Sequence, residues 1–275
     1  MACSVAIVVP LGIDKIRLTG GEPLLRKNLD RLVRMLVAIP GIKDVGLTTN
    51  GITLAEHAQS LWDAGLRRIN ISLDTLEEER FRSIARRPGV DRVVAGILAA
   101  KQAGFDPVKV NGVAIRGTTE DDIVPLCRFA REHGVEMRFI EYMPIGADDW
   151  ERSKVLYAHE ILEKIEAEVG PLVPAADYDP RNPAMDFDYA DGGGRVGIIA
   201  SVSRPFCRSC NRIRLTAEGK LACLFALEEI DMFAATAIRK RSAPPCERAW
   251  PRSGKATRST AHASSNPRTM HAIGG

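Results

Sequence analysis

The chain has 275 residues, which is enough to bury a full core and to form either one large α/β domain or two smaller ones. Apolar residues make up 45% of it and charged residues 27%, a composition typical of an ordinary globular protein. The formal net charge of +3 is too small to indicate nucleic-acid binding, so any basic patch must be local. The apolar opening stretch 2–13 has no basic residue before it and is soon followed by Asp14 and Lys15, which argues against a signal peptide or a membrane span. We therefore expect a cytoplasmic protein without a membrane or nucleic-acid partner.

Short β-branched runs alternate with helical patterns from Lys15 to about Met143. The runs cover 16–18, 45–48, 69–73, 108–114 and 137–140. Two helical faces between them consist of Leu29, Leu32, Val33, Leu36 and Val37, and of Val90, Val94, Ile97 and Leu98. Glycines that would cap helices are Gly65, Gly104 and Gly134. This alternation predicts repeated βα units and a parallel sheet.

Polar residues or glycines follow most of the runs. They are Thr19-Gly20-Gly21-Glu22-Pro23, Thr48-Thr49-Asn50-Gly51, Ser72-Leu73-Asp74 and Glu141-Tyr142-Met143. In parallel barrels this end of the strands carries the chemistry, so the pattern favours an open or closed βα barrel with one active rim. A doubly wound sheet would give the same pattern, and ordinary turns would explain any one segment alone.

The alternation stops after Met143. We expect a helix over 158–169, an irregular segment over 171–194, a strand over 196–199 and a hairpin over 211–224 that turns at Glu218-Gly219. Residues 239–258 hold seven Lys or Arg against one Glu, which indicates a solvated tail in preference to a nucleic-acid site. The predicted organisation is a barrel core over 11–145, an extension over 146–235 and a poorly ordered basic tail over 236–275 that ends in Gly-Gly.

Three of the six cysteines lie close together in the sequence, as Cys207-x2-Cys210 followed by Cys223. In a reducing compartment this spacing indicates thiolate ligands for zinc or an iron–sulfur cluster. A structural zinc site needs a fourth ligand, which Cys246 could supply from the tail. Three thiolates on a cubane cluster instead leave one iron open for a substrate atom. From the cysteines alone, both interpretations stand.

Two arginines follow Cys210 with strand spacing, so the side chains of Arg212 and Arg214 are predicted to point to one face. Paired guanidinium groups beside an open metal position suit a nucleoside triphosphate, although cross-strand ion pairs are the simpler alternative. Gly20-Gly21 at the end of the first strand would let a ligand approach the backbone closely and would expose carbonyl acceptors to an ammonium group.

Several motifs occur in an order that resembles one family. They are Lys15-Ile16-Arg17-Leu18-Thr19-Gly20-Gly21-Glu22-Pro23-Leu24, Leu47-Thr48-Thr49-Asn50-Gly51, Asn70-Ile71-Ser72-Leu73-Asp74-Thr75, Val108-Lys109-Val110-Asn111, Phe139-Ile140-Glu141-Tyr142-Met143-Pro144 and Phe206-Cys207-x2-Cys210-Asn211-Arg212-Ile213-Arg214-Leu215. Together they resemble the GTP 3',8-cyclases of the radical S-adenosylmethionine (SAM) superfamily, over about 12–227. The closing Arg268-Thr269-Met270-His271-Ala272-Ile273-Gly274-Gly275 resembles the family's double-glycine tail.

The resemblance implies an incomplete (β/α) radical-SAM barrel, a partial TIM barrel, followed by a C-terminal β-hairpin and extension that carry an auxiliary cluster site. It implies SAM contacts at Gly20, Gly21, Glu22, Ser72 and Met143. It implies GTP contacts at Arg17, Thr48, Lys109, Arg212 and Arg214. It implies that Cys207, Cys210 and Cys223 bind an auxiliary 4Fe-4S cluster that holds the guanine base.

The implied activity is that of a lyase in molybdenum cofactor (molybdopterin) biosynthesis. In the family, SAM cleavage leads to removal of the ribose C3' hydrogen of GTP, and C3' then joins C8 of guanine to give (8S)-3',8-cyclo-7,8-dihydroguanosine 5'-triphosphate. The product passes to cyclic pyranopterin monophosphate synthase. The resemblance also leaves a homodimer open.

The sequence departs from the family in several places. The Cys-x3-Cys-x2-Cys motif of the SAM-cleaving cluster does not occur in residues 1–275, and the pattern begins about fifty residues late, without the first barrel strand. We therefore expect this polypeptide by itself not to cleave SAM. The spacing from Cys210 to Cys223 is one residue shorter than the family's. Two alternatives follow: a non-catalytic remnant that binds a nucleotide and a cluster, or a peptide-modifying radical SAM relative.

Overall fold

The structure is a computed structural model of the chain, and it describes residues 2–144, 150–177, 179, 182–205, 211–216, 220–222 and 230–231. An eight-stranded sheet has the order β1-β2-β3-β4-β5-β8-β7-β6, and a three-stranded sheet has the order β11-β10-β9. The strands are β1 (Lys15–Leu18), β2 (Asp44–Thr49), β3 (Arg68–Ser72), β4 (Val108–Ala114), β5 (Glu136–Glu141), β6 (Leu172–Pro174), β7 (Met185–Tyr189), β8 (Arg195–Ile199), β9 (Arg214–Leu215), β10 (Lys220–Ala222) and β11 (Ile230–Asp231).

The large sheet is singly wound. Strands β1 to β5 pair in sequence order and in parallel, and β8 adds to β5 in parallel. Strands β7 and β6 then extend the sheet antiparallel. A doubly wound sheet reverses its strand order at a switch point between parallel strands, and the described strands β1 to β5 follow one another without such a reversal. The sheet is therefore a curved, open relative of a βα barrel, as the sequence predicts.

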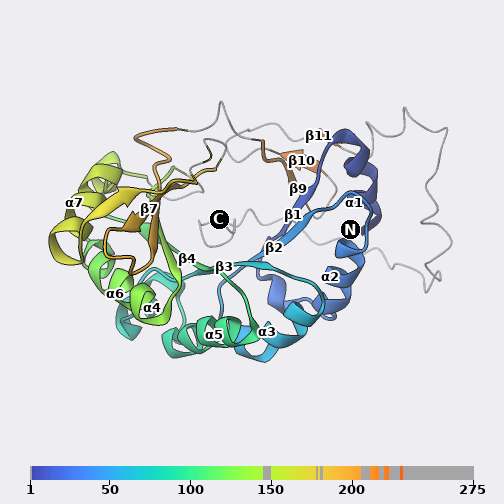
Figure 1. The fold of residues 1–275 in the computed structure, drawn as a ribbon, viewed down its shortest axis with the longest axis horizontal. Helices are drawn as coiled ribbons and strands as arrows, with labels where there is room; N and C mark the ends of the chain where they lie inside the picture. The colour runs from blue at the N-terminus through green and yellow to red at the C-terminus, as the bar shows by residue number, and fades with distance from the viewer. Residues whose placement is uncertain are drawn as a thin grey trace, which may run out of the picture.

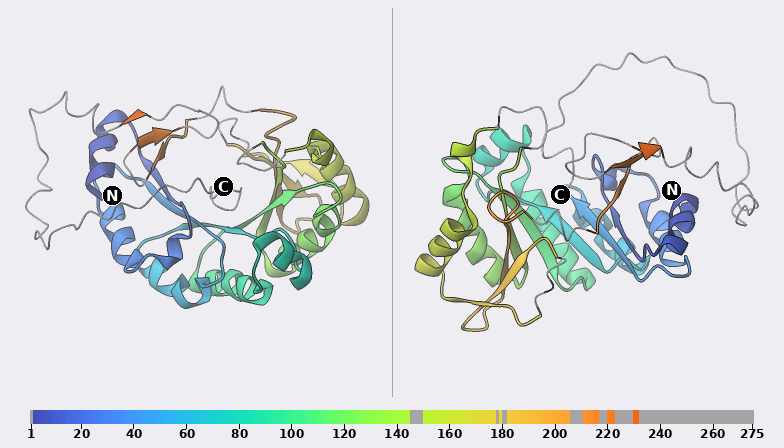
Figure 2. Two further views of the ribbon diagram at one scale, coloured as in Figure 1. Left: turned by 180° about the vertical axis from the view of Figure 1, so that it is seen from behind. Right: turned by 90° about the horizontal axis from the view of Figure 1, so that it is seen from above.

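The helices cover the convex face of this sheet (Figures 1 and 2). They are α1 (Ala2–Val8), α2 (Leu29–Val37), α3 (Leu54–Asp63), α4 (Glu78–Ala85), α5 (Val90–Ala103), α6 (Ile123–His133) and α7 (Ala158–Glu168), with short 3-10 turns η1 (Val9–Leu11), η2 (Pro23–Leu25), η3 (Glu120–Asp122) and η4 (Arg152–Lys154). Both figures place β9 and β10 close to β1. Within the described part of the chain, no helix is long and apolar enough to cross a membrane.

Alternation along each strand separates an apolar face from a polar one. Val45 and Leu47 on β2, and Ile69 and Ile71 on β3, are almost fully buried in one core that includes the helices. The residues between them belong to the opposite, concave face, because successive side chains point to opposite sides of a strand. The core therefore lies between sheet and helices, and the concave face is left for polar groups.

Left-handed glycines end two of the helices. Gly104 (φ 106°) follows α5 and Gly134 (φ 61°) follows α6, and each donates its backbone N–H to a carbonyl of the last turn. A residue with a Cβ rarely adopts this conformation, so both helix ends are fixed by the sequence.

The segment 171–194, predicted to be irregular, contains strands β6 and β7. The prediction was wrong because Pro, Asp and Gly dominate the composition and conceal a strand pattern. Met185, Phe187 and Tyr189 alternate with Asp186 and Asp188, and every second side chain faces the core side. The strand predicted over 196–199 is confirmed as β8. The antiparallel pairing of β9 with β10 confirms the two arms of the predicted hairpin, whose turn at Glu218-Gly219 lies outside the described residues.

One cysteine lies within the core. Cys127 on α6 has no exposed surface, and burial raises the pKa of its thiol to about 12. It is therefore a small packing residue of the interior.

Candidate functional site

The strand register places residues of the concave face in three rows that run across the strands. Neighbouring rows lie about 6.6 Å apart along the strand direction, which is the rise of two residues. The lowest row runs from Arg17 through Gly46 to Arg68, which are directly paired on β1, β2 and β3. A Cβ on Gly46 would lie 3.8 Å from Cζ of Arg17, an ordinary contact distance, so the guanidinium lies beside this glycine. Arg68 donates from Nη1 to Asp44 at 2.5 Å. This row is cationic, with one carboxylate at its side.

The middle row consists of Thr48, Asn70, Lys109 and Glu136, paired across β2, β3, β4 and β5. Thr48 is buried, and its hydroxyl accepts a hydrogen bond of 3.3 Å from Nη1 of Arg17. The row therefore connects to the lower one at its β2 end. Neighbouring strands lie about 4.8 Å apart, so Thr48 and Lys109, two strands away, lie roughly 10 Å apart.

The upper row consists of Ser72, Asn111, Arg138, Gly197 and Asp186. Nη2 of Arg138 lies 3.1 Å from Oδ1 of Asp186, and an added Cβ on Gly197 would lie 2.7 Å from the same oxygen. Gly197 thus makes room for the ion pair. Oδ1 of Asn111 is buried and has no hydrogen-bond partner among the described residues, so a ligand that donates a hydrogen bond would satisfy it.

Arg17 is the most strongly perturbed cation of the site. The residue is exposed at the surface of β1, yet neighbouring protein atoms partly desolvate its charged group. This desolvation, with the like charge of Arg68 next, lowers the pKa of Arg17 to about 10, and Arg212 contributes in the same direction. The guanidinium stays protonated at neutral pH. It is therefore a charge that an anion would stabilise.

Lys109 lies in an ion pair in this structure. Its Nζ is 2.7 Å from Oε2 of Glu136, and both side chains are only 16% exposed. Burial, followed by the charge of Arg138, lowers the pKa of Lys109, and Glu136 opposes that shift. A phosphate bound by Lys109 would compete with this carboxylate.

The Gly-Gly-Glu loop lies at the carboxyl end of β1. Gly20 (φ 92°) and Gly21 (φ 49°) are both left-handed, and a Cβ on either would meet no atom within 4 Å. Glu22 instead faces the protein. Its Oε1 accepts from Oγ1 of Thr49 at 2.6 Å, and its Oε2 accepts from the backbone N–H of Asn50 at 2.7 Å. The carboxylate of Glu22 therefore fixes the loop to β2, while the backbone of the two glycines stays accessible.

Other residues named by the sequence are placed at the same end of the sheet or beside β1. Ser72 ends β3, and Met143, which is buried, follows β5. Arg214 begins β9, and Arg212 lies near enough to Arg17 to influence its pKa. The cysteines Cys207, Cys210 and Cys223 lie outside the described residues.

Several residues of the rows were not named from the sequence. They are Arg68, Asn70, Glu136, Arg138 and Asp186. The signal was present, because polar residues occupy every second position in Glu136-Met137-Arg138-Phe139, but one strand alone does not show which residues of its neighbours lie alongside.

A cavity of about 390 Å³ lies at the amino-terminal ends of β2, β3 and β4. It is lined by Lys43, Asp44, Arg67, Arg68, Ile69, Asn70, Asp106, Pro107 and Lys109. Four cations against two carboxylates make it electropositive, and three of its residues belong to the polar rows. It is therefore a suitable space for a polyanion.

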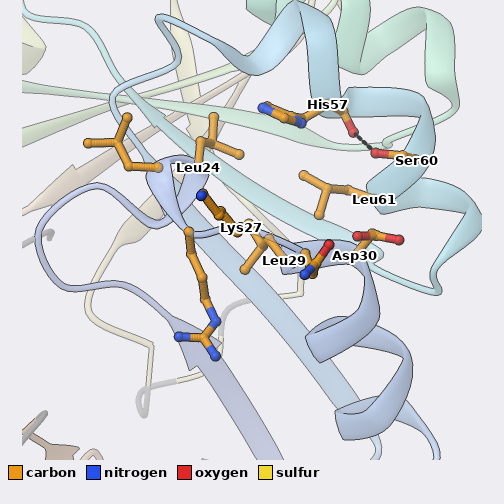
Figure 3. A pocket seen from close by; sticks show the side chains of 10 residues that line it. Leu24, Lys27, Leu29, Asp30, His57, Ser60 and Leu61 are labelled. Carbon is orange, nitrogen blue, oxygen red and sulfur yellow. Dashed lines mark hydrogen bonds between the residues drawn. The ribbon is translucent and has the colours of Figure 1, made fainter.

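A second cavity, of about 260 Å³, lies between η2, the start of α2 and α3 (Figure 3). Leu24, Leu29 and Leu61 line it together with Lys27 and His57. None of its residues belongs to the rows, so it is not part of the candidate site.

Comparison with known proteins agrees with this architecture. Residues 5–130 match the family model described as Radical SAM superfamily, and residues 135–251 match the one described as Molybdenum Cofactor Synthesis C. A radical SAM methyltransferase from Sphaerobacter thermophilus is a solved structure with a TM-score of 0.49 at 16% identity, covering 62% of this chain and 55% of that chain. The first of these models covers strands β1 to β4 of the singly wound sheet and the glycine loop after β1, so this part of the chain is a radical SAM domain.

Curated relatives define the family more closely. A GTP 3',8-cyclase from Moorella thermoacetica is 50% identical over 222 residues, which cover 80% of this chain and 68% of that protein. One from Rhodopirellula baltica is 48% identical over 227 residues, covering 81% of this chain and 63% of that protein, and one from Aquifex aeolicus is 47% identical, covering 81% and 69%. The chain therefore belongs to the GTP 3',8-cyclase family. It spans about two thirds of the length of these relatives.

Proposed function

We propose that this chain carries the GTP- and SAM-binding face of a GTP 3',8-cyclase, which acts in molybdenum cofactor biosynthesis. The observation that carries the proposal is the convergence of cations from distant segments on one concave face. Arg17 comes from β1, Lys109 from β4 and Arg212 from the segment before β9. A nucleoside triphosphate, with several negative oxygens, is the kind of ligand that such a group of cations binds.

GTP would lie along the lower and middle rows. In this arrangement Arg17, Lys109, Arg212 and Arg214 hold the triphosphate, and the hydroxyl of Thr48 keeps Arg17 oriented through their hydrogen bond. The 390 Å³ cavity beside Lys109 supplies space at the lower end of the site. The chain's contribution is thus to hold the nucleotide in one orientation, which is what a reaction between two atoms of one molecule requires.

SAM would lie at the carboxyl ends of the strands. The open, left-handed Gly20 and Gly21 fit this ligand, because their backbone carbonyls can accept from an ammonium group that approaches without steric obstruction. Ser72 and Met143 lie at the same edge of the sheet. In this structure Glu22 fixes the loop through its hydrogen bonds with Thr49 and Asn50, so its part in SAM binding is to hold the glycines in place.

The chemistry of hydrogen removal from the ribose would come from SAM, cleaved by an electron from a 4Fe-4S cluster. The protein's own residues bind and orient the two substrates. Cys207, Cys210 and Cys223 are proposed to hold an auxiliary 4Fe-4S cluster. The remaining proposals are that the product is consumed by cyclic pyranopterin monophosphate synthase and that the chain forms a homodimer in a cytoplasmic setting.

GTP titration of the Arg17→Ala variant tests the site. A charge-assisted contact contributes about 1.5 to 3 kcal/mol, so Arg17→Ala should weaken GTP binding by roughly ten- to a hundredfold. The matched control is Arg34→Ala on α2, because Arg34 is exposed and pairs with Asp30 in the same helix. Equal GTP affinities for wild type and Arg17→Ala would overturn the proposed site.

Iron analysis tests the auxiliary cluster separately. Anaerobic reconstitution should load one cluster per chain, and Cys210→Ser should remove it. Cys246→Ser should retain the iron, whereas a four-thiolate zinc site would depend on that residue. Zinc in place of iron, or close to eight irons per chain, would contradict this assignment.

A further inference from the structure

The carboxylate of Glu141 is the most heavily hydrogen-bonded side chain of the sheet's carboxyl edge, and none of the roles above uses it. Glu141 ends β5 and has no exposed surface. Its Oε2 accepts from the backbone N–H groups of Val202 and Ser203, each at 2.7 Å. Its Oε1 accepts from the backbone N–H of Ala158 at 2.8 Å and from the hydroxyl of Ser203. A buried carboxylate with four donors is a fully satisfied charge.

These bonds join three separate segments. Ala158 is the first residue of α7, so the negative charge also meets the positive end of that helix. Val202 and Ser203 belong to the turn that leaves β8, and the hydroxyl of Ser201 donates to the backbone carbonyl of Glu141 itself at 3.2 Å. The turn is therefore attached to the end of β5 through three consecutive residues.

The residues that follow Glu141 and Ser203 in the chain show why this attachment matters. Met143, a proposed SAM contact, lies two residues after Glu141 on the same chain segment. Cys207, a proposed cluster ligand, lies four residues after Ser203, and Arg212 lies nine residues after it. One buried carboxylate thus ties the strand that leads to a proposed SAM contact to the turn that leads to the proposed cluster.

We infer that Glu141 is a positioning residue, which fixes the start of the cluster-bearing segment against the SAM edge of the sheet. The inference rests on the proposed function, because it concerns the same cluster and the same nucleotide. The neighbouring backbone requires an acceptor at both oxygens. An amide in this place would direct its NH2 group at Ala158 N–H in one orientation, and at the N–H groups of Val202 and Ser203 in the other.

The Glu141→Gln variant tests the inference. Its iron content after anaerobic reconstitution should fall at least threefold, and its GTP affinity about tenfold, at a temperature where the variant is fully folded. Ser203→Ala removes one of the four donors and keeps the acid, so it should shift both quantities in the same direction but only about twofold. If Glu141→Gln does not fold, Ser203→Ala still tests the inference.

Asp122→Asn is the matched control. Asp122 is another buried carboxylate, 2% exposed, and accepts from Oγ1 of Thr75 at 2.6 Å and from Nη1 of Arg80. Its partners Thr75 and Arg80 belong neither to the segment of Met143 nor to the turn after β8, so its loss should lower the melting temperature while leaving iron content and GTP affinity of the folded protein unchanged. A general loss of stability would move both variants alike.

The outcomes separate the two proposals. Iron loss in Glu141→Gln together with retention in Asp122→Asn supports the positioning role. Equal iron and GTP affinity in wild type, Glu141→Gln and Ser203→Ala overturns it and leaves the proposed function intact, as does a loss shared equally with Asp122→Asn. A wild-type chain that takes up no iron removes the cluster assignment, and the positioning role with it.

Discussion

Lys109 and Glu136 face each other on neighbouring parallel strands, with Nζ 2.7 Å from Oε2 and both side chains largely buried. Arg138 approaches the same carboxylate oxygen to 3.7 Å. In the absence of a ligand, the single negative charge of Glu136 therefore lies beside two cations of the site. Under the proposed function, a triphosphate that binds Lys109 would take the place of this carboxylate.

Replacing Glu136 by Gln should separate stability from binding. The variant removes the negative charge that lies beside Lys109 and Arg138 in a partly buried site. Without ligand, the free energy of unfolding should therefore fall by about 1 to 3 kcal/mol. GTP should bind about three- to tenfold more tightly, because it no longer competes with the carboxylate. Urea denaturation and calorimetric titration measure the two effects.

The control for this pair is Glu151→Gln. Glu151 and Lys154 form an exposed ion pair at 2.7 Å, so the change should have little effect on stability and leave GTP affinity unaltered. Weaker GTP binding by Glu136→Gln would show that Glu136 supports the nucleotide instead of competing with it.

Inorganic triphosphate should raise the melting temperature of the protein. The pKa of Arg17 is lowered to about 10 because its charge is poorly hydrated and lies near other cations, so the folded state gains from an anion there. A ligand that binds only the folded state adds about 2.7 kcal/mol at a hundred times its Kd. Thermal unfolding in triphosphate and in sodium chloride of equal ionic strength makes the comparison, and Arg17→Ala should lose most of the shift. The same rise in sodium chloride would contradict a specific anion site.

Two glycines of the concave face should respond differently to the same substitution. In Gly197→Ala the new Cβ would lie 2.7 Å from Oδ1 of Asp186 and 3.0 Å from Cγ of Arg138, so their ion pair must shift, at a cost of roughly 1 to 3 kcal/mol. In Gly46→Ala the nearest atoms lie at 3.6 Å, an ordinary contact, and the change should stay within about 0.5 kcal/mol. Chemical denaturation of both variants decides, and equal losses would contradict the tight fit at Gly197.

Acid should weaken the attachment of α7. Nη2 of Arg116 donates to both oxygens of Glu160, at 2.8 and 2.7 Å, and this hydrogen bond is the main reason that the pKa of Glu160 lies below its usual value of 4.5. Because the folded pKa is depressed, the stabilisation is fully present above pH 4.5 and is lost as the pH falls through the folded pKa. It amounts to about 1 kcal/mol or less, since the pair is partly exposed.

The Glu160→Gln variant checks this acid dependence. Its free energy of unfolding should lie below that of wild type at pH 7, and the two curves should converge below pH 4.5. A constant difference between them across that range would exclude Glu160 as the titrating group.

The βα alternation and the positions of β1 to β5 follow from the sequence, because each strand combines a short apolar run with a glycine or polar residue after it. The exact helix face was harder to predict. Val94 and Leu98 were assigned to the buried side of α5, whereas Val93, Ile97 and Ala100 are the fully buried residues. One position along a helix turns a side chain by about 100°, and a sequence rich in Val, Ala and Leu does not fix that rotation.

Some residues of the candidate site could be named from the sequence, but their arrangement could not. The glycine loop and Arg17 stand out in the sequence, yet the ion pair of Lys109 with Glu136 depends on the register between two strands. Register is set by packing against the helices, which no single segment encodes. The hydrogen bonds of Glu141 to α7 and to the turn after β8 could not be predicted for the same reason, because their donors lie 17 to 62 residues later in the chain.

Cys127 makes the protein easier to study by chemical labelling. Its thiol has no exposed surface and a pKa of about 12, and alkylating reagents react with accessible thiolates. In the native protein iodoacetamide should therefore not alkylate Cys127 at neutral pH. A thiol that does react reports on one of the other five cysteines, and protection of Cys207, Cys210 and Cys223 after reconstitution would be read without interference from the core.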